Sequence, residues 1–199
     1  NTEGKGQLFT DIDELGNFPD YPILIEKYND SLYSGHRPES DLMLEHNQVF
    51  INDYKLDTCT VIEKLQELSE SGMENYSDDV ELWLLFGDYE IDCDEKKDII
   101  TRIFSKSKVG VIYGSAGVGK STLINHVSHY LNNEAKLYLT QTNPAKENLM
   151  RKINAENTTF STIESFKRQG SAFVKYKLLV IDECSTVSNK DMVEVLQKA

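Results

Sequence analysis

A run of nine residues near the middle of the chain combines glycines, a lysine and hydroxyl side chains at a fixed spacing. The run is Gly114-Ser-Ala-Gly-Val-Gly-Lys-Ser-Thr122, and it matches the pattern G-x-x-x-x-G-K-[ST] at every fixed position. Glycines let the backbone N–H groups of such a loop converge on phosphate oxygens. Lys120 would reach the β and γ phosphates, and the Ser121 hydroxyl would ligate Mg²⁺. The residues predicted to bind the nucleotide are Gly114, Ser115, Ala116, Gly117, Val118, Gly119, Lys120, Ser121 and Thr122.

Two acidic residues follow an apolar run later in the chain. Leu178-Leu-Val-Ile181 predicts a buried strand, and Asp182 and Glu183 come directly after it. Since open α/β sheets bind ligands at the carboxyl ends of their strands, we expect both carboxylates at the nucleotide. Asp182 would hold Mg²⁺ through water, and Glu183 would be the base that polarises the attacking water. The alternative is a strand that simply ends in polar residues.

These two motifs predict catalysis by Lys120, Asp182 and Glu183, with ATP and Mg²⁺ as cofactors and with Ser121 and Asp182 holding the metal. An adjacent Asp-Glu pair is typical of hydrolytic ATPases and not of small nucleotide kinases. A GTPase would carry a guanine-reading N-K-x-D, and Asn189-Lys-Asp-Met192 fails at its last position. The sequence also has no ABC-type signature. It therefore predicts an ATP hydrolase.

Short apolar runs alternate with helical segments in the second half of the chain. Buried strands are predicted at residues 109–113, 136–140 and 178–181. Helices are predicted at residues 95–105, 121–131, 144–153 and 190–199. Strands that alternate with helices form a parallel sheet with helices on its faces. The predicted fold class is therefore α/β, a RecA-like P-loop NTPase sheet with flanking helices, incomplete at the C-terminus.

Charge is distributed unevenly along the chain. Residues 1–98 carry 25 acidic and 7 basic side chains, a net charge of −18, whereas residues 99–199 carry 8 and 14, a net charge of +6. These two values make up the net charge of −12 of the whole chain. Such a step predicts two units with different partners. We expect an acidic accessory region at residues 1–93 and a P-loop NTPase domain at residues 94–199.

The accessory region is predicted to be mainly helical or irregular. Residues 1–55 have no sustained period, with only short segments at residues 23–28 and 48–51. Helical spacing of apolar residues predicts a helix at residues 57–69, and Asp78 would cap a second helix that Gly87 ends. The acidic surface is either an ordinary solvated face or a docking surface for a protein partner.

Four blocks, in this order, resemble the first motor domain of superfamily 1 DNA helicases, in particular the RecD-like branch. The P-loop at residues 114–122 is the first block. Leu139-Thr-Gln-Thr-Asn-Pro-Ala-Lys-Glu-Asn-Leu149 resembles motif Ia, and Thr159-Phe-Ser-Thr-Ile-Glu-Ser-Phe166 resembles motif Ib. Val180-Ile-Asp-Glu-Cys-Ser185 is similar to motif II. The resemblance covers about half of the chain, residues 94–199.

The resemblance implies contacts with DNA phosphates, in single-stranded DNA, at Thr142, Asn143 and Thr162, where the family presents backbone and hydroxyl donors. Basic residues would add positive charge along the same track, namely Lys146, Arg151, Lys152, Lys167 and Arg168. The alternative is helix capping alone, with Asn143 as one N-cap and Ser161-Thr-Ile-Glu164 as a capping box. Nucleic acid is the partner that the resemblance predicts.

This sequence departs from the family pattern at three places. Residues 94–98 lack the Gln that reads adenine, and Glu164 stands where motif Ib usually has His. The chain also ends at Ala199, before motif III and the second motor domain. We therefore expect a truncated first motor domain that binds ATP weakly, hydrolyses it slowly and does not unwind DNA.

The leading hypothesis is the ATP-binding part of an ATP-dependent DNA helicase or translocase, which hydrolyses ATP with magnesium to move on nucleic acid. The alternative is a regulatory ATPase switch of the AAA+ or signalling type that acts on protein partners. A third hypothesis is that the acidic half mimics DNA and occludes the track of the motor. Cys59, Cys93 and Cys184 lack metal-ligand spacing, and the chain has no long apolar stretch and no apolar leader. These features predict a cytoplasmic protein without a membrane span.

Overall fold

A computed structural model describes residues 6–16, 18, 20–33, 35, 40–169 and 175–198 of the chain. The chain divides into two compact units, Asn1–Ile62 and Glu63–Ala199, and each unit contains its own three-stranded sheet. Within the described residues, no helix is long and apolar enough to cross a membrane. The boundary between an accessory region and an NTPase domain, predicted between residues 93 and 94, stays a prediction.

The first unit contains a small antiparallel sheet that the sequence did not reveal. Its elements are β1 (Thr10–Asp11), η1 (Ile12–Glu14), α2 (Tyr21–Ser31), β2 (Leu42–Glu45), β3 (Gln48–Ile51) and the beginning of α3 (Asn52–Ser69). The strand order is β1-β3-β2. His46 and Asn47 join β2 to β3 with φ values of 50° and 64°, the left-handed conformation that a two-residue hairpin loop of type I′ requires. The segments noted at residues 23–28 and 48–51 lie in α2 and β3.

Asn29 bonds helix α2 to strand β2 of this sheet. The Asn29 side chain donates to the Leu42 carbonyl at 3.0 Å and accepts from the Leu42 N–H at 2.8 Å. Asp20 caps the start of the helix by accepting from the Ile23 N–H at 3.2 Å. A side chain that bonds both backbone groups of one residue completes the hydrogen bonding at the beginning of β2.

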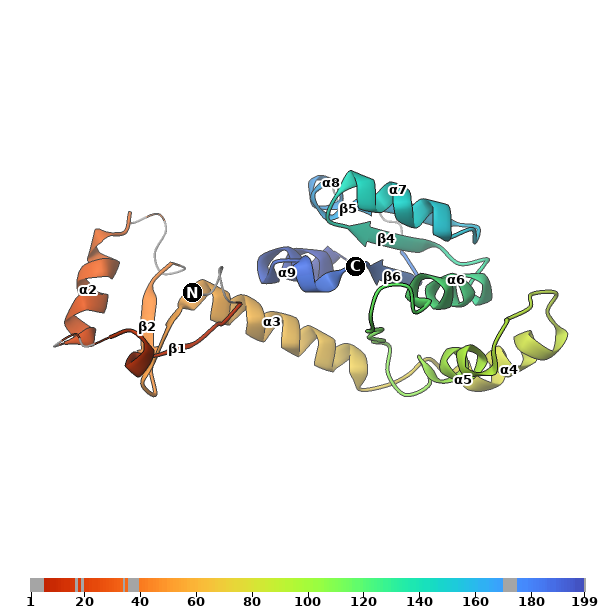
Figure 1. Ribbon diagram of the computed structural model, residues 1–199, viewed down its shortest axis with the longest axis horizontal. Coiled ribbons are helices and arrows are strands. Elements are labelled where there is room, and N and C mark those ends of the chain that lie inside the picture. The colour runs from red at the N-terminus through yellow and green to blue at the C-terminus, as the bar shows by residue number, and fades with distance from the viewer. Residues whose placement is uncertain are drawn as a thin grey trace. The chain divides into compact units, whose positions relative to one another are not determined.

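The second unit has the predicted α/β fold (Figure 1). Its elements are the end of α3, then α4 (Tyr76–Phe86), α5 (Asp94–Arg102), α6 (Lys120–Tyr130), β4 (Lys136–Thr140), α7 (Asn143–Lys152), β5 (Thr158–Thr162), α8 (Ile163–Arg168), β6 (Leu178–Ile181), η3 (Cys184–Thr186) and α9 (Asn189–Lys198). The three strands are parallel, in the order β5-β4-β6. The strands predicted at residues 136–140 and 178–181 are confirmed, and the helices are confirmed to within a few residues at each end. The predicted last residue of α9, Ala199, lies outside the described residues.

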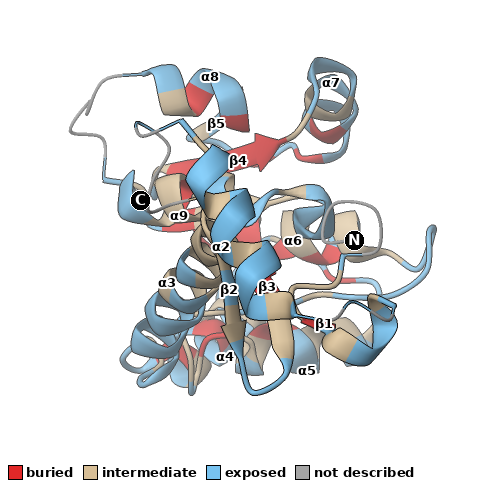
Figure 2. Ribbon diagram, turned by 90° about the vertical axis from the view of Figure 1, so that its left-hand side faces the viewer, coloured by how far each residue is buried: buried red, intermediate tan, exposed pale blue. Residues whose placement is uncertain are grey.

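Alternation along β4 gives the sheet its two covered faces. Leu137 and Leu139 pack in one cluster with residues of α8 and α9, which are Ile163, Phe166 and Val195. Tyr138 points to the other face and packs with Leu149 and Ile153 beside Ile124 of α6. All five residues of β4 are buried, as its red ribbon in Figure 2 shows. A strand buried on both faces is the expected centre of a parallel sheet.

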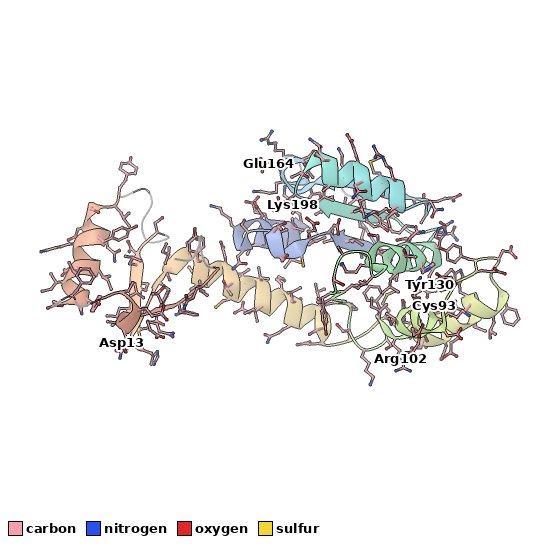
Figure 3. The ribbon with its side chains drawn as sticks, in the orientation of Figure 1. Asp13, Cys93, Arg102, Tyr130, Glu164 and Lys198 are labelled. Carbon is pink, nitrogen blue, oxygen red and sulfur yellow. The ribbon has the colours of Figure 1, made fainter. Side chains whose placement is uncertain are left out.

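A third cluster joins α4 and α5 to helix α6. It consists of Tyr76, Val80, Ile91, Ile100, Phe104, Leu123, Val127, Leu131 and Leu178. The single tryptophan of the chain, Trp83, packs against this cluster and stacks on Tyr89 with ring centroids 5.6 Å apart. Tyr89 stacks in turn on His129 of α6 at 4.1 Å. Figure 3 labels Tyr130, the last residue of α6, and Cys93, which precedes α5.

The strand predicted at residues 109–113 is wrong. This run is not paired with any described strand, and Val111 and Tyr113 are 75% and 90% exposed. Gly110 instead lies against the end of α5, where an added Cβ would come within 2.9 Å of the Ile103 side chain. The Ser107 hydroxyl also bonds both backbone groups of Val109 at 2.9 Å. In this run, these local contacts are present in place of hydrogen bonds to a neighbouring strand. The apolar composition of the run does not predict them.

The predicted cap of α4 is wrong as well. The helix begins at Tyr76, after Asn75 with φ 53°, so Asp78 lies inside the first turn. An acidic residue there is still favourable, because it faces the positive end of the helix dipole. The end of α4 before Gly87 is confirmed.

A buried lysine connects β4 to the end of α6. Lys136 is 0% exposed, and its Nζ donates to the carbonyl oxygens of Leu131 at 2.7 Å, Asn132 at 3.3 Å and Glu134 at 2.8 Å. The last carbonyl groups of a helix have no partner within the helix, and a cation there also opposes the negative end of its dipole. The ammonium group therefore satisfies the turn that follows α6.

We predict that Lys136→Met lowers the free energy of unfolding by about 2 kcal/mol, because buried carbonyl groups lose a charged donor. Urea denaturation followed by circular dichroism measures the change as a lower midpoint at unchanged slope. Lys152→Met, at an exposed position of α7, is the control. Equal midpoints for the two variants would contradict the role assigned to Lys136.

Candidate functional site

The loop that precedes α6 takes the backbone conformations for which its glycines are suited. Gly114, Gly117 and Gly119 have φ values of 154°, 84° and 89°. Gly119 is the left-handed residue directly before the helix, which begins at Lys120. L residues with side chains are strained in this region of φ, whereas glycine is not. The loop residues 114–118 are exposed, so their backbone N–H groups are accessible to an anion.

Lys120 lies over this loop. Its Nζ donates to the carbonyl oxygens of Gly114 and Ser115, at 2.8 Å each. The ammonium group is thus held beside the same backbone whose N–H groups the pattern assigns to phosphate. Loop and lysine together offer neutral donors and one positive charge, the chemistry that a polyphosphate needs.

The direction of α6 places this loop at one edge of the sheet. Lys136, the first residue of β4, bonds the carbonyl groups that follow α6, so the end of the helix lies at the amino end of the strand. Eleven helical residues and five strand residues each span about 16 Å. The start of α6 therefore reaches the carboxyl edge, where open α/β sheets bind ligands.

The two acidic residues follow β6 at this same edge. The Asp182 N–H donates to the Leu139 carbonyl at 2.9 Å, which holds the strand end against β4. Glu183 has φ 52° and ψ 43°, a left-handed conformation, and its carbonyl accepts from the Thr186 hydroxyl at 2.8 Å. Gln141, just after β4, donates to the Thr186 carbonyl at 3.2 Å. The turn that carries both carboxylates is thus tied to the neighbouring strand.

Glu183 stands out among the described residues with positive φ. The other non-glycine residues there are His46, Asn47, Asn75 and Asn157. Asparagine accepts the left-handed region because its short side chain bonds locally, but a glutamate gains nothing comparable. Backbone strain of this kind clusters at functional sites. The strain therefore supports a role for this residue beyond folding.

Thr142 and Thr162 lie at the carboxyl ends of β4 and β5, which pair in register through Thr140 and Thr162. Both hydroxyls are N-caps: Thr142 Oγ1 accepts from the Ala145 N–H at 3.3 Å, and Thr162 Oγ1 accepts from the Ser165 N–H at 3.2 Å. The N-caps predicted from the sequence, Asn143 and Ser161, are each one residue away from the observed caps. Asn143 is the first residue of α7, and Ser161 is a buried residue of β5.

A hydroxyl group that caps a helix can still form a further hydrogen bond. A hydroxyl oxygen that accepts a backbone N–H still has its own proton to donate. Thr142 is exposed, so this proton can reach an external acceptor. The two alternatives of the sequence, capping and phosphate contact, are therefore compatible, and the DNA contacts stay a prediction.

Two of the five basic side chains that were predicted to attract DNA form ion pairs with acidic residues of the same unit. Lys167 forms ion pairs with Asp191 at 2.5 Å and Glu194 at 3.3 Å, and the bond to Asp191 raises the pKa of its amine. Arg168 pairs with Glu164, labelled in Figure 3, at 2.9 Å. Among the described residues, no ion pair involves the basic side chains of α7, which are Lys146, Arg151 and Lys152. Lys146 lies near the start of α7 at this edge, whereas Arg151 and Lys152 lie in its last turn, towards the amino end of β5. Among these three side chains, Lys146 is therefore the one placed to add positive charge here.

A polar cluster beside the loop is not predictable from the sequence. It consists of Tyr89, Asp92, Lys96 and His126, and it joins the segment before α5 to helix α6. The nearest heavy atom to a Cβ added at Gly119 is Lys96 Cε, at 3.9 Å. Lys96 and Lys97 are adjacent in the sequence, so the sequence alone does not say which of them lies beside the P-loop.

Comparison with known families agrees with this geometry. A family model described as an AAA domain matches residues 94–199, from the first residue of α5 onwards. A comparison with curated proteins gave no match. The match covers the loop, all three strands of the parallel sheet and the acidic turn.

We predict that Glu183→Gly is more stable than Glu183→Ala by about 1 kcal/mol, because only glycine relieves the left-handed strain. Both variants lack the carboxylate, so their difference isolates the backbone. Urea denaturation of the two proteins under identical conditions measures it. An alanine variant at least as stable as the glycine variant would contradict the assignment of strain.

Proposed function

This chain belongs to the AAA domain family, and we propose that it is the ATP-binding part of an ATP-dependent DNA helicase or translocase. Residues 94–199 form a P-loop ATP-binding domain. The observation that carries the proposal is the convergence at one sheet edge of the P-loop, the acidic turn after β6 and two threonines at strand ends. Phosphate chemistry and phosphate-backbone contacts would then occupy neighbouring parts of the same edge.

Each residue of the P-loop site has a distinct task. The backbone of residues 114–119 would hold the phosphates, and the Lys120 ammonium would neutralise charge on the γ-phosphate. The Ser121 hydroxyl and the Asp182 carboxylate would hold Mg²⁺, which takes oxygen ligands. Glu183, exposed on its left-handed turn, would orient and deprotonate the attacking water. ATP supplies the phosphoanhydride bond, whose hydrolysis would drive movement.

DNA would run along the edge that carries Thr142, Asn143 and Thr162. The threonine hydroxyls have protons to donate, and Lys146, near the start of α7, adds attraction for a polyanion. Single-stranded DNA suits a track that contacts mainly the phosphate backbone. The free cysteines Cys59, Cys93 and Cys184 fit a reducing, cytoplasmic setting.

The rival proposal is a regulatory ATPase switch that acts on protein partners, with the acidic region as its docking surface. Both proposals use the P-loop and the acidic turn in the same way. They differ in what stimulates hydrolysis: single-stranded DNA stimulates a translocase, whereas a switch responds to its protein partner and ignores DNA.

We predict that Lys120→Ala abolishes ATP-dependent activity without unfolding the domain, because the bonds of Lys120 to the Gly114 and Ser115 carbonyls lie in an exposed loop. The full-length protein is assayed for ATP hydrolysis with and without single-stranded DNA, and circular dichroism reports folding. Unimpaired hydrolysis in the variant would defeat the proposed site. Hydrolysis by the unmodified protein that DNA leaves unchanged would favour the switch.

We further predict that Thr142→Asp weakens binding of a single-stranded oligonucleotide about tenfold relative to Thr142→Asn. Asp and Asn are equally good N-caps, so both variants keep α7 and differ only in charge. Fluorescence anisotropy at fixed salt measures affinity for the full-length protein, and thermal melting checks that both variants are equally stable. Equal affinities would remove Thr142 from the DNA track.

A further inference from the structure

A second lysine lies next to the P-loop. Lys96 is in α5, and its Cε is 3.9 Å from the position that a Cβ would take at Gly119. Its side chain is 22% exposed, and its Nζ pairs with the two carboxylate oxygens of Asp92 at 2.7 and 3.0 Å. Lys120 Nζ bonds the Gly114 and Ser115 carbonyls at the beginning of the loop, and Lys96 lies beside Gly119 at its end, so the two lysines approach the loop from different elements.

The carboxylate that holds Lys96 faces a second nitrogen base. His126 Nε2 lies 3.8 Å from Asp92 Oδ1 and has no hydrogen-bond partner among the described residues. The other ring nitrogen, Nδ1, is bonded to the Tyr89 hydroxyl at 2.9 Å. Burial lowers the pKa of the His126 imidazole, Lys96 and His129 lower it further, and the Asp92 carboxylate opposes this by raising it. Lys96 Nζ is closer to Asp92 Oδ1 than His126 Nε2 is, so Lys96 is the main cation beside this carboxylate.

Breaking the Lys96–Asp92 ion pair requires little free energy. Asp92 is 69% exposed, so water can hydrate its carboxylate once the ammonium has moved. Exposed ion pairs contribute little net stability for this reason. A lysine ammonium at the end of a flexible stem rotates easily, and a polyphosphate offers it more negative charge than one carboxylate does.

We propose that Lys96 is a second phosphate-binding lysine of the P-loop, which Asp92 holds in the absence of nucleotide and which moves to the phosphates when ATP binds. This inference rests on nucleotide binding at the P-loop. Lys97, the next residue, is the natural control, because it pairs with Asp94 at 2.9 Å and is 43% exposed. Its ammonium is no part of the cluster beside Gly119.

The test measures affinity for a non-hydrolysable ATP analogue with Mg²⁺ by calorimetry, with this 199-residue chain. Lys96→Ala should weaken binding about tenfold, the loss of one charge-assisted hydrogen bond. Lys97→Ala should bind like the unmodified chain, and Lys96→Arg should retain most of the affinity. Asp92→Asn should bind about threefold more tightly, because the lysine is released and a negative charge is removed.

The double variant separates these two causes. If Asp92 acts through Lys96, Asp92→Asn strengthens binding much less when Lys96 is already Ala, and the effects are non-additive. Equal affinity of Lys96→Ala and the unmodified chain, with binding lost in Lys120→Ala, would overturn the role of Lys96 and leave the P-loop site intact. Binding by neither the unmodified chain nor any variant would overturn both. A purely structural pair would lower the melting temperature of Lys96→Ala and leave its affinity unchanged, which also contradicts the proposal.

Discussion

Three hydrogen bonds from the buried Lys136 ammonium fix how helix α6 lies on the sheet. They hold the end of the helix at the amino end of β4, and the rest of the candidate site follows from that direction. The P-loop must then lie at the carboxyl edge, together with the turn after β6 and the starts of α7 and α8. A desolvated lysine is costly unless its donors are satisfied, so these bonds accept few alternative geometries. The helix is thereby held in one orientation at the end that is remote from the phosphates.

The elements that the sequence predicted correctly are those with a strong local pattern. The apolar runs of β4 and β6 and the helical spacing of α6 and α7 each identify one structure. Strand β5 was missed because Thr158-Thr-Phe-Ser-Thr162 is mostly polar, and its pairing with β4 is what makes it a strand. The error at residues 109–113 has the opposite cause. There the apolar run exists, but contacts of Gly110 with Ile103 compete with the sheet.

The candidate site was predictable where the backbone itself carries the chemistry. The glycine spacing of the P-loop specifies left-handed positions before a helix, and the structure has all three. The strained conformation of Glu183 was not predictable, because nothing in the sequence distinguishes it from an ordinary turn. The pairing of Arg168 with Glu164 is an i,i+4 contact within α8, which the spacing in the sequence favours. The pairing of Lys167 was not predictable, since its partner Asp191 lies on α9. Pairing across helices depends on tertiary packing, which no local spacing encodes.

The single tryptophan gives the second unit an optical probe of its own. Trp83 stacks on Tyr89, whose ring also stacks on His129 and whose hydroxyl bonds His126. Tyrosine is the only other strong fluorophore in the chain, so emission excited at the red edge of the absorption band arises from Trp83 alone. That emission responds to the packing of α4 against α6 within the second unit. Fluorescence therefore reports on the unfolding of the second unit, whereas total ellipticity reports on both units together.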